Sequence, residues 1–215
     1  MADCVPGKDG YIGDCELTQG LRERAEARVK REERGFAWKA SLPKAAKVRL
    51  FILDVDGVLT DGSITYSDEG LELKTFNSRD GFGLNLVRQA GVEVAIITAR
   101  TSQALVRRCQ DLKIDQLHQG QRNKVAVFEK MIADLGLKPD EVAYMGDDWL
   151  DLPLLSRVGF ATTVADAVPE MAEAVDYVCR RAGGHGAVRE VCDLLVDAKG
   201  MYRELLDKYL ARGSS

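Results

Sequence analysis

Two aspartates at the end of an apolar run are the residues of this chain whose spacing best suits chemistry. Asp54 and Asp56 follow the mainly apolar segment 48–53 and precede Gly57. Such a segment is typical of a strand buried on both faces of a parallel sheet. Both carboxylates would then lie at the carboxyl end of the strand, where open α/β sheets bind ligands. Two acids placed there suit a metal-assisted phosphoryl transfer in which one carboxylate is the nucleophile.

Further polar side chains follow later apolar segments of the chain. They are, in chain order, Thr98, Lys124, Asp147 and Asp148. The strand ends of a doubly wound sheet gather at one edge, so we expect these side chains to lie around Asp54 and Asp56. Each signal alone is weak, but their ordered succession after apolar strands favours one catalytic centre.

Gathering carboxylates at one edge has an electrostatic cost. Asp54, Asp56 and Asp147 would bring three negative charges together, and like charges 4 Å apart repel by about 4 kcal/mol in an effective dielectric of 20. Oxygen ligands beside a phosphate favour a hard divalent cation, so the sequence predicts a Mg²⁺ site. Lys124 would add a positive charge, and Thr98 a hydroxyl donor, for a phosphoryl group.

The elements that must position these residues follow an alternating pattern from Lys47 onward. Short apolar segments alternate with amphipathic ones, which predicts an α/β fold with a Rossmann-like, doubly wound parallel sheet. Strands are expected at 48–54, 92–98, 113–118, 141–146, 160–164 and 176–179. Helices are expected at 81–90, 101–112, 122–136, 149–157, 168–174 and 186–198.

One segment departs from this alternation. Polar and apolar residues alternate at 63–67 and 71–76 around the turn 68–70, which predicts a β-hairpin. A two-stranded hairpin is marginally stable alone in water, so its apolar side chains need a partner. The parent domain or a neighbouring subunit could supply it.

The composition limits the classes of partner. With 46% apolar and 30% charged residues the chain is an ordinary globular protein, and its net charge of −4 argues against nucleic acid or an anionic membrane. No apolar segment approaches membrane-spanning length, and the N-terminus has no signal-peptide core. Five scattered cysteines without a C-x-x-C pair predict reduced thiols in a cytoplasmic protein rather than a metal site.

The chain divides into three regions by composition. Residues 1–43 form a charged extension, in which 21–34 predict a solvated helix or a mobile arm. The catalytic domain is placed at 44–198. Residues 199–215 form a tail that could extend as a helix or dock on another subunit.

The ordered residues resemble the haloacid dehalogenase superfamily. More specific motifs are similar to those of its capless subfamily of octulosonate 8-phosphate phosphatases, over about residues 48–198. These motifs are DVDGVLTDG (54–62), FNSRDG (76–81), ITAR (97–100), GQRNK (120–124), GDD (146–148) and GGHGAVREVCDLL (183–195). The resemblance implies a Mg²⁺-dependent phosphatase of lipopolysaccharide precursor biosynthesis. It also implies a protruding hairpin in place of a cap domain, and a homotetramer joined through the hairpin at 63–76.

The resemblance implies a role for each member of the set. Asp54 would be the nucleophile that forms an aspartyl-phosphate, and Asp56 the acid that protonates the leaving group and then the base that activates water. Thr98 and Lys124 would orient the phosphoryl group. The metal ligands would be Asp54, the main-chain carbonyl of Asp56, Asp147 and, less directly or through water, Asp148, with Asp151 in a similar outer position.

The sugar-acid end of such a substrate needs cations and hydrogen-bonding groups. Arg79 and Arg100 lie beside the predicted site loops, Arg108 follows on the next helix, and arginine can hold a carboxylate through two hydrogen bonds. Hydrogen-bonding groups are expected where a helix begins after Phe76. The predicted substrate-binding set is Asp56, Asn77, Ser78, Arg79, Asp80, Gly81, Arg100, Arg108 and Lys124.

Two alternatives remain open. A nonulosonate 9-phosphate phosphatase would share the fold and the hairpin. Those relatives tend to have an acid in place of the arginine of the T-x-R motif and to lack that of FNSRDG, so Arg100 and Arg79 favour the octulosonate. The other alternative is a non-catalytic domain or a receiver phosphorylated on aspartate. Receivers have their acidic pair before the phosphorylated residue, so the order here favours hydrolysis.

Overall fold

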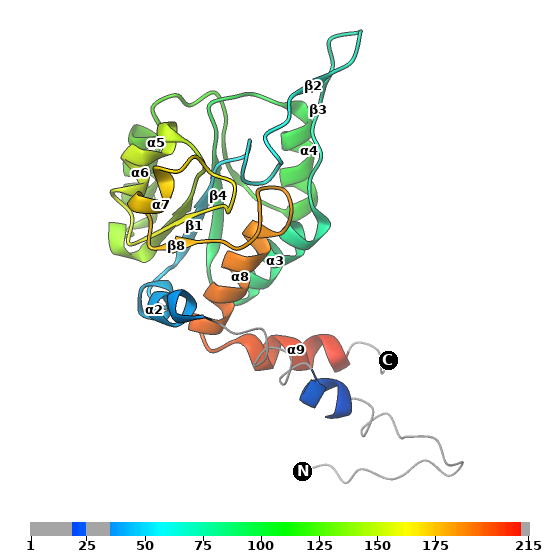
Figure 1. The fold of residues 1–215 in the computed structure, drawn as a ribbon, viewed down its shortest axis with the longest axis vertical. Helices are drawn as coiled ribbons and strands as arrows, with labels where there is room; N and C mark the ends of the chain where they lie inside the picture. The colour runs from blue at the N-terminus through cyan, green and yellow to red at the C-terminus, as the bar shows by residue number, and fades with distance from the viewer. Residues whose placement is uncertain (1–18, 25–34, 212–215) are drawn as a thin grey trace, which may run out of the picture.

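A six-stranded parallel sheet forms the centre of the computed structural model, which describes residues 19–24 and 35–211. The strand order is β5-β4-β1-β6-β7-β8, so the first strand lies in the middle (Figure 1). The strands are β1 (Leu50–Leu53), β4 (Glu93–Ile97), β5 (Gln116–His118), β6 (Val142–Met145), β7 (Phe160–Thr163) and β8 (Tyr177–Val178). The predicted doubly wound α/β sheet is confirmed, with strands shorter than expected at one or both ends.

The strand register places the carboxyl ends of β1, β4 and β6 side by side at one edge of the sheet. Leu53 lies opposite Ile96 of β4 and Met145 of β6. The backbone N–H of Asp54 then donates to the Met145 carbonyl at 3.0 Å. The residues that follow β1, β4 and β6 therefore leave the sheet at the same edge, as the sequence predicts.

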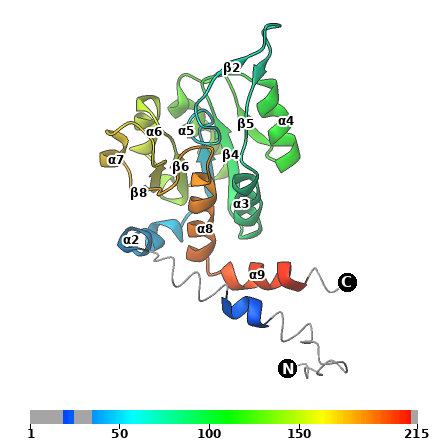
Figure 2. The same ribbon diagram turned by 45° about the vertical axis from the view of Figure 1, so that its right-hand side comes forward.

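Helices cover both faces of the sheet (Figure 2). Phe51 and Leu53 face one layer and Leu50 and Ile52 face the other, because successive side chains of a strand point to opposite sides. The first layer contains α2 (Phe36–Ala45), α3 (Ser78–Gln89), α4 (Gln103–Leu112) and α8 (Ala187–Ala198). The second contains α5 (Lys124–Leu135), α6 (Leu152–Leu155) and α7 (Met171–Ala174). The 3₁₀ helices η1 (Pro139–Glu141) and η2 (Trp149–Asp151) flank β6.

The predicted hairpin is present between β1 and α3. Its strands β2 (Thr65–Tyr66) and β3 (Glu72–Leu73) are antiparallel, and they project from the sheet edge (Figure 1). The apolar side chains of the hairpin are 50–61% exposed; they belong to Ile64, Tyr66, Leu71 and Leu73. The rest of this chain therefore covers less than about half of the surface of these side chains.

Helix α2 is the element that sequence reasoning did not predict. It crosses the position 43/44 at which the extension and the domain were divided, with Pro43 inside it. Trp38 packs edge-on against Tyr177 and donates from Nε1 to Asp197 at 3.0 Å. Residues from Phe36 onward thus belong to the packed body. Of the residues before Phe36, only Gly35 and 19–24 are described, and 19–24 are helical.

Other differences are local. The segment 149–157, expected as one helix, divides into η2 and α6, with Pro153 in the first turn of α6. The tail forms α9 (Tyr202–Ala211), whose Leu205 is buried against Leu86 and Val196. Among the described helices, none has both the length and the apolar character needed to cross a membrane.

Candidate active site

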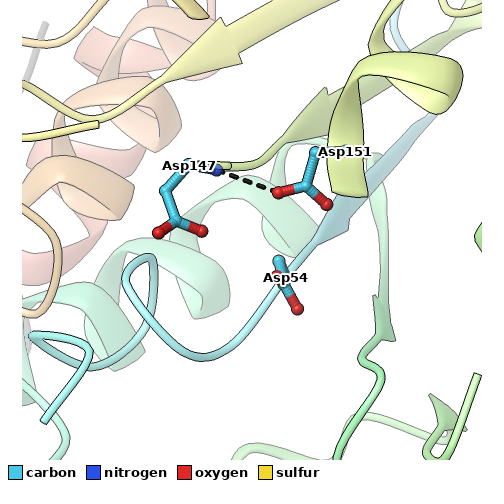
Figure 3. Close-up of side chains that lie close together, drawn as sticks. All are labelled: Asp54, Asp147 and Asp151. Carbon is cyan, nitrogen blue, oxygen red and sulfur yellow. Dashed lines mark hydrogen bonds between the residues drawn. The ribbon is translucent and has the colours of Figure 1, made fainter. Parts of the chain in front are cut away.

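Three aspartates meet at the edge where the parallel strands end (Figure 3). Asp54 follows β1, Asp147 follows β6, and Asp151 ends η2. Each offers a carboxylate oxygen, and these oxygens lie within 4.8 Å of one another. The gathering predicted for Asp54 and Asp147 is therefore present, and Asp151 joins it.

Lys124 supplies the positive charge of this group. The Asn123 side chain accepts from the Ala126 N–H and begins α5, which places Lys124 at the first position of the helix. The Lys124 Nζ lies 2.9 Å from Asp54 Oδ2 and 2.6 Å from Asp151 Oδ1. The lysine is buried, so water screens these interactions little.

Asp151 stabilises the loop after β6 through hydrogen bonds. Its Oδ2 accepts from the backbone N–H of Asp147 at 3.0 Å and of Asp148 at 3.4 Å, and its Oδ1 accepts from the Tyr144 hydroxyl at 2.5 Å. Tyr144 and Asp151 are both buried. Asp151 therefore fixes the position of Asp147.

The pKa values of two carboxylates in this group are raised, mainly because the carboxylates are buried. Burial raises the pKa of Asp54 to about 6, although the Lys124 charge opposes it. Burial, followed by the charges of Asp151 and Asp54, raises the pKa of Asp147 to about 7. Burial lowers the pKa of Lys124, but the charges of Asp54 and Asp151 outweigh it and the net shift is upward. Because three carboxylates face one lysine, the charge of the site favours binding of a further cation.

The two oxygens of Asp54 differ in their surroundings. Oδ2 is paired with Lys124, whereas Oδ1 is buried and has no hydrogen-bond partner within the described part of the chain. A buried oxygen without a partner is costly, and a ligand bound to Oδ1 would remove that cost. Oδ1 is the atom of this site best placed to bind a cation or attack an electrophile.

Two glycines allow the loops around this group to approach one another. At Gly57 the backbone has φ +81°, and a Cβ there would overlap the Asp147 carboxylate. At Gly183 a Cβ would overlap the carbonyl oxygen of Gly57. Any side chain at either position would push these loops apart.

Thr98 is buried at the end of β4 and ties neighbouring strand ends together. Its N–H donates to the His118 carbonyl at 3.0 Å, and its carbonyl accepts from the Gln121 N–H at 2.9 Å. Its hydroxyl oxygen accepts from the Arg100 N–H at 3.4 Å. This side chain lies at the sheet edge as predicted, and its contact with a phosphoryl group stays a prediction.

The Asp56 side chain is not a member of the group that Asp54, Asp147 and Asp151 form. It pairs with the Lys74 ammonium and, at 3.5 Å, with Arg100 Nε. Glu72 bridges the same two cations, at 2.9 Å from Lys74 and 3.0 Å from Arg100. Sequence reasoning predicted Asp56 and Arg100 but missed Glu72 and Lys74, whose only signal was their alternation with apolar residues in the hairpin.

Asp148, predicted as a less direct or water-mediated ligand, also has a role in the local backbone structure. Its carboxylate accepts from the Trp149 N–H at 2.7 Å and begins η2. Asp151, one turn later, takes the third place beside Asp54 and Asp147. The geometry thus places Asp151 rather than Asp148 in the group of three, and the water-mediated role of Asp148 stays a prediction.

The predicted substrate residues at the start of α3 divide into two kinds. Asp80 accepts from the Arg189 N–H at 2.7 Å and joins α3 to α8, while Arg108 donates to the Asn77 carbonyl at 3.2 Å and lies against Gly81. The side chains of Asp80 and Arg108 therefore make hydrogen bonds within the protein. Three others keep surface for a ligand: Ser78 and Arg79 are exposed, and Asn77 is partly so while it donates to the Gly184 carbonyl at 3.1 Å.

Known proteins share both the sequence and the fold. A family model of haloacid dehalogenase-like hydrolases matches residues 113–191. The 3-deoxy-D-manno-octulosonate 8-phosphate phosphatase KdsC of Escherichia coli K12 is 49% identical over 163 residues, which cover 76% of this chain and 87% of that protein. The chain belongs to this phosphatase family within the haloacid dehalogenase-like hydrolases.

Solved structures of the phosphatase family have the same fold. The Yersinia pestis enzyme superposes with a TM-score of 0.75 at 43% identity, over 76% of this chain and 89% of that one. The Moraxella catarrhalis enzyme, solved with a magnesium ion, a phosphate ion and a KDO molecule, has a TM-score of 0.76 at 38% identity, over 78% and 97% of the two chains. The predicted haloacid dehalogenase fold is confirmed.

Proposed function

We propose that this chain is a Mg²⁺-dependent phosphatase that converts 3-deoxy-D-manno-octulosonate 8-phosphate to the free sugar acid and phosphate, in lipopolysaccharide precursor biosynthesis. The observation that carries the chemistry is Asp54, which has one oxygen held by Lys124 and the other unpartnered beside two more carboxylates. The relatives from Escherichia coli and Moraxella catarrhalis support the choice of substrate.

The chain's own residues account for the transfer. Asp54 Oδ1 attacks phosphorus, and the bond to the sugar oxygen breaks while Asp56 donates a proton to that oxygen. Asp56 then accepts a proton from water, which attacks the aspartyl-phosphate and restores the Asp54 carboxylate. Lys124 keeps Asp54 oriented, and with Thr98 it would bind the phosphoryl oxygens.

The carboxylate group fits a hard divalent cation. Asp54, Asp147 and Asp151 offer only oxygen ligands, and one carboxylate oxygen of each lies within 4.8 Å of the others. When bound, Mg²⁺ would offset the negative charge that these residues share with a phosphoryl group. The Asp56 main-chain carbonyl remains a further candidate ligand.

Arg100 is the strongest candidate for the sugar carboxylate. Its side chain keeps 37% of its surface exposed and lies beside Asp56, where the leaving oxygen must be protonated. Arg79 is a second exposed guanidinium near the same edge. Arg108 is held against Asn77 and Phe76, which favours a supporting role.

The phosphatase panel that tests this proposal contains four substrates with Mg²⁺. They are octulosonate 8-phosphate, a nonulosonate 9-phosphate, a hexose phosphate and an aryl phosphate. We expect kcat/KM to be highest for the octulosonate, by at least about tenfold over the nonulosonate. A preference for the nonulosonate would retain the mechanism and overturn the substrate. Phosphate release from none of them would overturn the function.

We further propose a cytoplasmic homotetramer joined through residues 63–76. The exposed apolar side chains of the hairpin support the assembly, because contiguous exposed apolar surface marks protein interfaces. The free thiols of the buried Cys109, Cys179 and Cys192 suit a reducing compartment. Cys4 and Cys15 lie outside the described residues.

Charges introduced on the hairpin are expected to separate the subunits. In the variant Leu71→Asp/Leu73→Asp, burying two carboxylates in an interface would cost several kcal/mol, so sedimentation should give a smaller species. Phe36→Asp is the matched control, because Phe36 is 91% exposed and lies on α2, away from the hairpin. A sedimentation coefficient that is equal in all three proteins would contradict assembly through the hairpin.

A further inference from the structure

Four charged side chains and a tyrosine connect the hairpin to the body of the protein. Lys74 pairs with Asp56 and Glu72, and Arg100 pairs with the same two carboxylates. Tyr66 accepts a hydrogen bond from Arg100 Nη2 at 3.2 Å. The Lys74 side chain is only 2% exposed, so the pairs it makes are shielded from water. Two cations and two carboxylates thus form a nearly neutral group.

Arg100 does not use all of its hydrogen-bond donors in this group. Its Nη2 donates to Glu72 Oε2 at 3.0 Å. Its Nε is buried and has no hydrogen-bond partner among the described residues, although Asp56 Oδ2 lies 3.5 Å away. Glu72 therefore holds Arg100 through one nitrogen. A free carboxylate could bind the guanidinium through two parallel hydrogen bonds, which is the stronger arrangement.

The Glu72 carboxylate contacts Arg100, the residue that we propose binds the carboxylate of the substrate. Lys74, the larger contributor, and Arg100 lower the pKa of Glu72, so it is anionic at neutral pH. A sugar acid that binds Arg100 through Nη2 competes with Glu72, which already accepts from that nitrogen. The product of the reaction keeps the same carboxylate as the substrate and loses only the phosphoryl group, so Glu72 can displace the product in the reverse sense.

We propose that Glu72 is an internal competitor for the substrate carboxylate and promotes release of the sugar-acid product. With the phosphoryl group gone, the product is held mainly through its sugar and carboxylate, and the return of Glu72 to Arg100 weakens that hold. This role rests on the proposed function, because it requires a ligand with a carboxylate. It assigns Glu72 a role in product release, after the chemical step.

Binding of the free sugar acid is the direct test. Calorimetric titration of the full chain with 3-deoxy-octulosonate, in the presence of Mg²⁺, should give about tenfold tighter binding for Glu72→Gln than for the wild type, since a lost ionic competitor at a charge-assisted pair is worth about one decade of affinity. Glu72→Ala should change affinity in the same direction. Glu69→Gln is the matched control, because Glu69 is an exposed acid of the same hairpin and should bind as the wild type does.

Product inhibition supplies the second readout. With an aryl phosphate as substrate, the inhibition constant of the free sugar acid should fall about tenfold in Glu72→Gln. Weaker binding in that variant would overturn the proposal, because Glu72 would then orient Arg100 rather than compete for it. Unchanged affinity, or no binding to any of the proteins, would overturn it as well. Failure of the proposed function shows separately, as no phosphate release from octulosonate 8-phosphate.

Discussion

Replacement of Asp54 by asparagine is expected to abolish phosphate release. The amide keeps the shape of the side chain but cannot form the acyl-phosphate bond, so kcat should fall by at least about 10³-fold. The structure supports this expectation, because Asp54 Oδ1 is buried beside Asp147 and Asp151 and has no hydrogen-bond partner within the described residues. Steady-state release of phosphate from octulosonate 8-phosphate measures the effect.

A matched variant separates this effect from the loss of a charge. Asp111→Asn removes a carboxylate from an exposed position on α4 and should leave kcat unchanged. Thermal unfolding of both variants verifies that each is folded. An Asp54→Asn protein that turned over at the wild-type rate would contradict the nucleophilic mechanism.

Replacement of Lys124 by methionine is expected to damage both stability and activity. The change leaves Asp54 and Asp151 buried near one another without their cation. Breaking a buried ion pair from one side costs about 3–5 kcal/mol, so the free energy of unfolding in metal-free buffer should fall by that amount. The loss of a cation beside the phosphoryl group should also lower kcat/KM by about 10²-fold or more.

Urea unfolding with and without Mg²⁺ measures the stability effect. Mg²⁺ should restore part of the loss in Lys124→Met, because a cation bound by the carboxylates of the native state stabilises that state. Lys130→Met on the exposed side of the same helix is the control and should change the unfolding free energy little. Equal stability of the two variants in metal-free buffer would show that the Lys124 pairs contribute nothing net.

The meeting of Asp54, Asp147 and Lys124 could be predicted because it follows from topology. Once strands alternate with helices in a parallel sheet, the residues after each strand must share one edge. The choice between Asp148 and Asp151 could not be predicted in the same way. The two lie three positions apart, and the turn of η2 decides which carboxylate faces Asp54.

Two features depended on partners that are distant in the sequence. Helix α2 follows a charge-dense stretch, and Trp38 finds Tyr177 and Asp197 only in the folded chain. In the hairpin, alternation marks Glu72 and Lys74 as sharing one face. It does not indicate that this face meets Asp56 and Arg100. The local sequence pattern thus predicts the positions of most helices and strands well, but it predicts the contacts between them poorly.

The central place of β1 sets the order in which the site can be assembled during synthesis. β1 pairs with β4 on one edge and with β6 on the other, and β6 begins only at Val142. A nascent chain that ends before Val142 contains Asp54 but neither Asp147 nor Asp151, and one edge of its central strand has no native partner. Such an edge is open to pairing with other chains. The arrival of β6 therefore completes the catalytic group and closes that edge in one event.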